Sequence, residues 1–566
     1  MWVDERSQQV SLMGIIYWKA TRVLVWLGEE DKSAKQVSAG KAFDFIRRCS
    51  SFKEAAANNR RGHPTAMPEK IEDIQGGKEA VSWESVRRLF TRDWFTRVWV
   101  VQELGLARNA TFYCGDASID FWDLDGFCEF LLFHAPLSQS HYRLNLQTLN
   151  LALKYQESTR GNHRLEFGSD PHLAEDLCDV LASARGLDCT DARDSVYAFL
   201  GHPSAFKKQL LDSEPYMWYP QNFYNNRPTV IKPDYSNETT AEAVYFRFAF
   251  TMIEQHGLGM KLLRYIQHNE KSIEDVPSTE ECIPLTEKDT SPPEENIPSW
   301  VPRWNICEAS PFTRAVNFYT AATRLPSTSF EISLGTEFEP ISLSIKARYM
   351  GPVYCSMLIP YEQYTKHSPN SESETAQPPD ANDDYYDPLE SIIETLDVLK
   401  NDFATQEYCD MRSLSATLTG GLTCNEGELR EVINEKNATQ HYYDFCAYRH
   451  AKSQDTRNPG TTQTDSLTPS LSQDHEKGDY KRYATAYLAE STRCFLTRDG
   501  RLGLGPRITE GGDQIWLPMG ADTPFVLRPL HDGNFKILGQ AYLHGIMQGE
   551  AVAHLTEDDF EVVKLV

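Results

Sequence analysis

Residues 92–115 read RDWFTRVWVVQELGLARNATFYCG, and the rest of the chain can be organised around this stretch. It brings four tryptophan or phenylalanine rings, three arginines and a Gln-Glu pair into one short segment that ends in glycine. The run from Ala110 to Cys114 predicts a buried strand. Rings and charges at this density are unusual for a core element alone, so the residues before the strand predict a positioned site.

Helical and strand-like patterns alternate on both sides of this stretch. A continuous apolar run, RVLVWLG at 22–28, predicts a buried strand. Apolar residues at three-and-four spacing predict helices over 5–20, 33–49, 82–90 and 121–133. This alternation predicts an α/β domain over residues 1–135.

The pattern changes after that domain. It is mostly helical over 136–350 and mostly strand-like over 351–566. Asp499-Gly500 and Asp532-Gly533 are hairpin signals between short apolar runs, so the C-terminal region is predicted to be α+β or mainly antiparallel β. Two polar segments, 366–384 and 452–479, are predicted to be disordered insertions.

Composition limits the classes of function. The chain has 566 residues, enough for roughly two to four domains, and its 81 Asp and Glu outnumber 56 Lys and Arg. The net charge of −25 argues against general binding to nucleic acids or anionic membranes. No secretory signal or apolar span is visible, and the twelve cysteines are scattered without a C-x-x-C pair. We therefore expect a cytoplasmic protein with no metal site.

Trp99 and Glu103 are the candidate functional pair. In a helix they lie four residues apart on one face. The indole can then cover one side of the Glu103 carboxylate, and this partial desolvation raises the pKa of the carboxylate. The valines around Trp99 weaken the helix prediction, and a strand would also place positions 99, 101 and 103 on one face. The competing interpretation, which the residues alone favour, is structural: Glu103 pairs with Arg97 or Arg92 and fastens a packed helix.

Other polar groups carry weaker signals. Asp188, Asp191, Arg193 and Asp194 cluster at an expected helix N-terminus, where carboxylates cap free amides, so a capped and salt-bridged turn is predicted. The sequence has no nucleophile elbow, phosphate-binding loop, zinc-protease motif or dinucleotide fingerprint. No cofactor is expected.

RDWFTRVWVVQELGLA followed by a strand ending in Cys-Gly resembles the central signature of the fungal heterokaryon incompatibility (HET) domain family. Further pieces that resemble the family follow its order along nearly the whole chain. They are WVD at 2–4, ER at 5–6, QV at 9–10, VLVWLG at 23–28, CTDARDSVYAFLG at 189–201, KPDYS at 232–236, IPSWVPRW at 297–304, GLGP at 503–506, GDQIWLPMG at 512–520, PFVLRP at 524–529 and GQAYLHGIMQGEA at 539–551.

The resemblance implies a cytosolic fungal protein of nonself recognition, whose HET domain triggers programmed cell death when incompatible cells fuse. HET domains are also similar to Toll/interleukin-receptor (TIR) domains, some of which cleave NAD with the glutamate of a W-x-x-x-E motif. Trp99 and Glu103 match that motif. The resemblance therefore implies Glu103 as the catalytic carboxylate, Trp99, Arg97 and Arg92 as supporting residues, and NAD as a substrate. A carboxylate can stabilise the oxocarbenium-like state of such a cleavage.

The start of the chain departs from the family pattern. It begins at Met1-Trp2-Val3-Asp4, without the usual first strand and part of a ligand loop, so an incomplete TIR-like α/β domain with an exposed sheet edge is expected. Homotypic or allelic proteins are the expected partners. Two alternatives stay open: a non-catalytic signalling or scaffold module that acts by homotypic assembly, and an inactive, degenerate paralogue.

Overall fold

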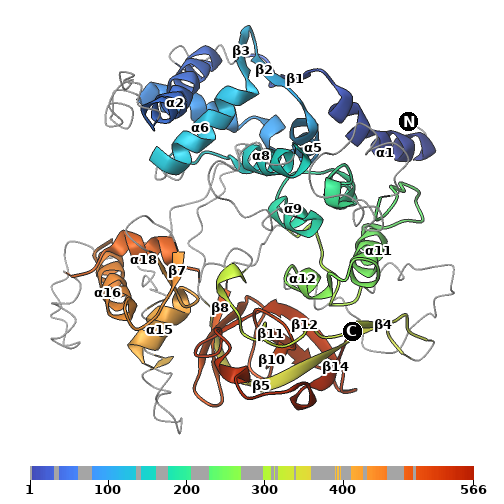
Figure 1. Ribbon diagram of the computed structural model, residues 1–566, viewed down its shortest axis with the longest axis vertical. Helices are drawn as coiled ribbons and strands as arrows, with labels where there is room; N and C mark the ends of the chain where they lie inside the picture. The colour runs from blue at the N-terminus through green and yellow to red at the C-terminus, as the bar shows by residue number, and fades with distance from the viewer. Residues whose placement is uncertain are drawn as a thin grey trace, which may run out of the picture. The chain divides into compact units, whose positions relative to one another are not determined.

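The computed structural model divides the chain into two compact units, Met1–Gly257 with Trp304–Cys307, and Leu258–Arg303 with Glu308–Val566. Each unit has its own apolar core, and Figure 1 shows the helices and strands of both. The described residues are 3–30, 37–60, 80–134, 142–160, 176–205, 229–268, 297–306, 312, 316–336, 339–358, 389, 392–393, 395–396, 410–424, 430–455, 477–488 and 492–566.

The predicted domain boundaries at residues 135 and 350 stay predictions. The first predicted insertion, 366–384, lies outside the described residues. Most of the second, 452–479, lies outside them too, but its first four residues form the end of helix α16 (Ala438–Asp455).

A three-stranded sheet organises the first unit. β1 (Val23–Trp26) runs parallel to β2 (Ala110–Cys114), and β3 (Ala117–Asp120) pairs antiparallel with β2, which gives the order β1-β2-β3. The two predicted strands are thus confirmed, whereas β3 was not predicted. Gly115 begins the turn between β2 and β3 with a φ of 54°, a backbone conformation that glycine adopts without strain.

Helices cover one face of this sheet. The structure contains α1 (Val3–Lys19), α2 (Ala39–Arg60), α4 (Ala80–Phe90), α6 (Phe121–His134) and α8 (Gln147–Arg160). The helices predicted over 5–20, 82–90 and 121–133 are confirmed. α2 begins later than predicted, and the first residues of its predicted range lie outside the described ones. Helices α2 and α6 pack against each other, and the Trp83 ring of α4 lies 4.8 Å from Phe45 of α2 in the core between them and the sheet.

The remainder of the first unit is helical. α9 (Leu177–Ser183) begins with a capping box formed by Asp176 and Asp179. α10 (Asp194–Tyr197) is a single turn, and α11 (Ala241–Glu254) is capped by Thr240, whose hydroxyl accepts the Ala243 amide. The loops before α10 and α11 carry the polar network described below.

The second unit is built on the long strand β5 (Ser342–Leu358). β10 (Gln514–Pro518), β11 (Phe525–Pro529), β12 (Phe535–Gln540) and β14 (Glu561–Leu565) pair in that order, and both end strands of this series pair with β5. These five strands therefore close into a ring. β8 (Thr492–Thr497), β9 (Leu502–Pro506) and β13 (Tyr542–Leu543) extend the sheet from the far end of β5, and β4 (Glu331–Ser333) also pairs with β5.

The β-rich C-terminal region and both of its hairpins were predicted correctly. Gly500 joins β8 to β9 with a φ of 85°, and Gly533 joins β11 to β12 with a φ of 82°. The helices α15 (Met411–Leu418), α16 and α18 (Tyr480–Ala486) and the short β6–β7 hairpin (Leu422–Cys424, Arg430–Val432) complete the unit in Figure 1, with α12 (Gly259–Leu263) near its start. Among the described helices, none is both long and apolar enough to cross a membrane.

Candidate functional site

The segment that carries Trp99 and Glu103 is a helix, α5 (Trp99–Leu106). The valines that follow Trp99 do not prevent it, because Val100, Val101 and Leu104 are fully buried and packing outweighs their weak propensity. A backbone bridge fixes the start of the helix: the Val98 amide donates to Asp188 O at 3.0 Å, and the Asp188 amide donates to Thr96 O at 2.6 Å. The helical alternative in the sequence is therefore confirmed.

Glu103 is a half-buried carboxylate. Burial raises its pKa, while a hydrogen bond donated by the Tyr17 hydroxyl of α1 and the positive charge of Arg97 act in the opposite direction. Burial and the neighbouring carboxylate also raise the pKa of Tyr17, so the hydroxyl stays protonated and keeps donating. Glu103 thus joins α5 to α1 through a polar link in a partly desolvated place.

Arg92 serves a different part of the sheet. Its guanidinium donates to Leu27 O at 2.7 Å and to Glu29 O at 3.0 Å, both just after β1. It therefore holds the end of β1 against the 3₁₀ helix η2 (Asp93–Thr96). Of the two arginines considered as partners of Glu103, it is Arg97 whose charge acts on the carboxylate.

Trp99 is fixed by a second carboxylate, Asp194. The indole Nε1 donates to Asp194 Oδ2 at 3.1 Å, Arg6 of α1 lies 3.3 Å from the same oxygen, and the Tyr235 hydroxyl donates to Oδ1. Asp194 is only 4% exposed, and burial raises its pKa against these donors. The Arg6 guanidinium also lies 3.6 Å from the centre of the Tyr235 ring, a cation–π contact.

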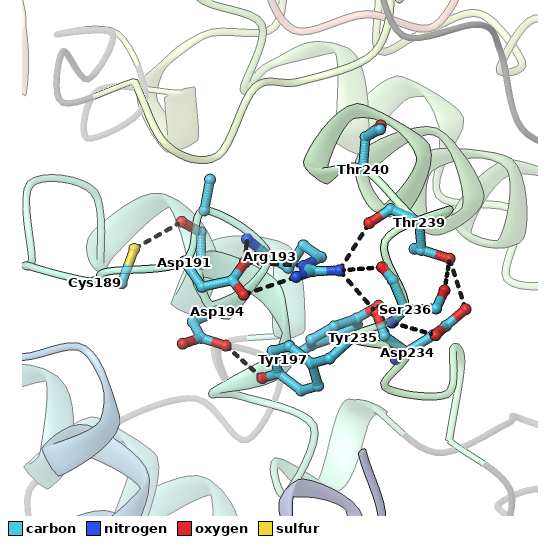
Figure 2. A network of polar contacts seen from close by, with 12 residues as sticks. Cys189, Asp191, Arg193, Asp194, Tyr197, Asp234, Tyr235, Ser236, Thr239 and Thr240 are labelled. Atoms are coloured by element: carbon cyan, nitrogen blue, oxygen red, sulfur yellow. Dashed lines mark hydrogen bonds and ion pairs between the residues drawn. The ribbon is translucent and has the colours of Figure 1, made fainter. Parts of the chain in front are cut away.

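The turn before α10 continues this network (Figure 2). Arg193 binds Asp191 through two parallel bonds of 2.9 Å, and Arg6 donates to Asp191 Oδ2 at 3.1 Å. Burial opposes ionisation of Asp191, but the bonds from Arg193 hold its pKa below the usual value. The predicted salt bridge is confirmed. The predicted cap is confirmed as well, because the Asp191 carboxylate accepts the backbone amide of Arg193 at 3.1 Å, although the N-cap residue of α10, Arg193, makes no side-chain capping bond itself.

Arg193 also reaches the loop before α11. Its Nη1 donates to Ser236 O at 2.9 Å and to Thr239 O at 2.8 Å, and it lies 3.4 Å from Asp234 O. Within that loop, Asp234 accepts the Ser236 amide at 2.9 Å and the Thr239 hydroxyl at 2.6 Å. As Figure 2 shows, one guanidinium therefore joins two loops that lie about forty residues apart in the chain.

A hollow of about 320 Å³ opens beside this ion pair. It is lined by Asp191, Ala192, Arg193, Ser236, Asn237, Thr239, Thr240 and Ala241. Trp99 and Glu103 do not line it. The network from Asp191 through Arg6 and Asp194 connects the hollow to Trp99.

Sequence reasoning found Trp99, Glu103 and the aspartate cluster, but it did not connect them. Tyr17, Arg6 and Tyr235 were missed as partners of the pair. The CTDARDS and KPDYS motifs contain Asp194 and Tyr235, so the motifs carried a signal. Their spacing along the chain could not indicate that both side chains meet at the Trp99 indole.

Comparisons with known proteins identify two segments of the chain. The model of the heterokaryon incompatibility protein (HET) family matches residues 3–103, from the start of α1 to Glu103, and the Het-6 β-barrel domain matches residues 436–563. Heterokaryon incompatibility protein 6, OR allele, from Neurospora crassa is 21% identical over 99% of this chain and 81% of that protein. No solved structure matches the chain.

Proposed function

We propose that this chain, a HET-domain protein with a Het-6 β-barrel domain, acts in the cytoplasm in fungal heterokaryon incompatibility, where its HET domain causes cell death by cleaving NAD. The family matches and the Neurospora relative support the biological role. The placement of Glu103 within the matched segment supports the chemistry. We also propose that the HET domain has a TIR-like fold, and this part of the proposal is supported by the family resemblance alone.

The carboxylate of Glu103 is the observation that carries the proposed chemistry. It is half-buried, so water screens it less than a surface carboxylate and its field acts more strongly on a nearby positive charge. Burial is the largest influence on its pKa and raises it, whereas Tyr17 and Arg97 act in favour of the ionised form, which is the form that stabilises a cation. Trp99, fixed by Asp194, lies one helical turn before it.

The proposed reaction breaks the bond between ribose C1 and the nicotinamide nitrogen. The electron pair of that bond leaves with nicotinamide, and the positive charge that develops on the ribose is stabilised by the Glu103 carboxylate. Water then adds to C1 and releases one proton to solvent. The products are nicotinamide and ADP-ribose, and no cofactor or metal enters the balance.

Incubation of the purified full chain with NAD tests this function. We expect nicotinamide to accumulate, and we expect Glu103→Gln, which keeps the shape of the side chain but removes its charge, to slow the reaction at least about 100-fold. Glu5→Gln is the matched control, because Glu5 is an exposed carboxylate on α1. It should leave the rate unchanged.

Two results would contradict the enzymatic proposal. One is an intact chain that consumes no NAD, and the other is a Glu103→Gln variant that consumes NAD as fast as the parent. If expression in a fungal host still arrests growth when Glu103→Gln has been introduced, signalling by assembly becomes the better account of the biological role.

A further inference from the structure

Two residues that hold Trp99 come from outside the segment of residues 3–103 that matches the HET family model. Asp194 is the first residue of α10, and Tyr235 lies in the loop before α11. The Tyr235 hydroxyl donates to Asp194 (Figure 2), and Asp194 accepts the Trp99 indole N–H at 3.1 Å. The tryptophan of the matched segment is therefore held by later parts of the first unit.

The Asp194 carboxylate makes hydrogen bonds through both of its oxygens. Oδ2 accepts Trp99 and Arg6, and Oδ1 accepts the Tyr235 hydroxyl. The carboxylate cannot turn without losing one of these bonds, and at 4% exposure water has little access to replace it. The orientation of the Trp99 indole is thus set by a carboxylate that is itself held in place.

Tyr235 is a fixed support for this carboxylate. It is 3% exposed, and its backbone amide donates to Ser7 Oγ of α1 at 3.1 Å. Its ring packs under the Arg6 guanidinium and meets the Tyr197 ring edge-on, with 5.3 Å between the ring centres. Contacts with α1 and α10 therefore determine where the hydroxyl points.

The position of Trp99 matters for Glu103 because the two side chains lie one turn apart on the same face of α5. An indole held in one orientation limits the access of water to that side of the carboxylate, and less water means a stronger field on a nearby positive charge. A freely turning indole would weaken this field. We expect that loss to slow the cleavage step and to leave the affinity for NAD largely unchanged.

We propose that Asp194 and Tyr235 are positioning residues for NAD cleavage and that both act through Trp99. This inference rests on the proposed function and adds two residues to it that lie outside the HET family match. Asp194 orients the indole, and Tyr235 holds the carboxylate of Asp194. The loops before α10 and α11 are therefore part of the HET site.

Steady-state kinetics of NAD cleavage by the full chain test the inference. Asp194→Ala removes the acceptor of the indole N–H, so it should lower kcat at least about tenfold and change KM less than about threefold. Tyr235→Phe removes only the hydroxyl and should lower kcat about threefold. Tyr245→Phe is the matched control, because the buried Tyr245 hydroxyl donates to Ala192 O at 2.8 Å beside the same turn. It should leave kcat unchanged.

A double-mutant cycle separates positioning from a general effect on the fold. Trp99→Phe keeps an aromatic ring but has no N–H to donate. In that background Asp194→Ala and Tyr235→Phe should each lower kcat by less than about twofold further, because the bond through which they act is already absent. A purely structural role would cost the same in both backgrounds. Circular dichroism checks that each variant is folded.

Fluorine NMR of a chain labelled with fluorotryptophan follows the indole without any NAD present. The Trp99 signal is identified by its loss in Trp99→Phe. We expect this signal to shift or broaden in Tyr235→Phe, because the indole samples more orientations once its acceptor is less firmly held. It should be unchanged in Tyr245→Phe.

The possible failures can be told apart. An active chain in which Asp194→Ala and Tyr235→Phe cleave NAD as the parent does, or lose as much again in the Trp99→Phe background, would overturn this inference and leave the proposed function standing. An unchanged Trp99 signal in Tyr235→Phe would also overturn it. If Asp194→Ala does not fold, Tyr235→Phe decides. An intact chain that consumes no NAD would contradict the proposed function, and the inference would fall with it.

Discussion

Asp194 and His202 are buried polar residues of the first unit whose ionisation matters for its stability. Asp194 is satisfied by donors from α1, from α5 and from the loop before α11, although burial raises its pKa. His202 is 1% exposed, its Nδ1 lies 2.7 Å from the Ser204 hydroxyl, and burial lowers its pKa to about 3. Because one pKa is raised and the other is lowered, the contributions of Asp194 and His202 to the free energy of unfolding change in opposite directions when the pH falls.

His202 predicts a loss of stability in mild acid. The unfolded chain takes up a proton near pH 6.5, whereas the folded chain does not until the pH approaches about 3, so stability is lost as the pH falls below 6.5. This group alone should lower the free energy of unfolding by about 1.4 kcal/mol between pH 7.5 and 5.5. Urea unfolding of the parent and of His202→Gln at both pH values measures it.

The His202→Gln variant is the reference for the pH dependence that His202 causes. Glutamine cannot titrate, and the difference in unfolding free energy between the parent and His202→Gln should shrink by about 1.4 kcal/mol at the lower pH. A difference that stays constant with pH would mean that His202 is already protonated in the folded chain or has no role in this dependence.

At the scale of secondary structure, long patterns were predicted well and short ones were not. Helix α1 and the strands β1 and β2 follow from apolar periodicity alone. β3 was missed because Ala117–Asp120 is short and polar, and only pairing with β2 makes it a strand. For α5 the sequence left helix and strand open, since the decision rests on burial of the valines after Trp99 and not on their propensity.

The contact between α5 and α8 explains why Gly105 is a glycine. A Cβ at Gly105 would lie 2.8 Å from the Cβ and ring atoms of Tyr155 on α8, whereas a Cβ at Gly40 of α2 would lie 3.8 Å from its nearest neighbour. We expect Gly105→Ala to destabilise the chain by about 1–3 kcal/mol despite the better helix propensity of alanine. Gly40→Ala should be neutral or slightly stabilising.

Thermal unfolding of the two glycine variants separates these effects. Gly105→Ala should lower the Tm by several degrees relative to the parent, while Gly40→Ala should not lower it. Equal Tm values for Gly105→Ala and the parent would show that α5 can move away from α8 at little cost.

At the scale of the whole molecule, the second unit depends on closure of its ring of strands. The sequence predicted mainly antiparallel strands in the C-terminal region, but it could not predict the ring. Hairpin partners are neighbours in the chain and leave a turn signal, whereas the pairing of β5 with β14 joins residues about two hundred positions apart and leaves none. The contacts of Arg6 and Tyr235 with Asp194 also join residues far apart in the chain, so the sequence could not predict them either.

β14 closes the ring, and side chains on its two faces are expected to contribute differently to the free energy of unfolding. Leu565 is fully buried, and Val562 on the other face is 68% exposed. Leu565→Ala should lower the free energy of unfolding by about 2–5 kcal/mol, and Val562→Ala should change it by less than about 0.5 kcal/mol. Urea titration followed by near-ultraviolet circular dichroism measures both, and similar costs for the two would contradict a packed ring.

The bond between Arg6 and Asp194 has a consequence for synthesis on the ribosome. The two residues are 188 positions apart. At a translation rate of about 5–20 residues per second, Asp194 is therefore synthesised roughly 10–40 s after Arg6. During that interval α1 can bind α5, but it lacks the anchor that also orients Trp99. During translation there is therefore a period in which residues 3–103, which match the HET family model, have been synthesised but Trp99 is not yet bonded to Asp194.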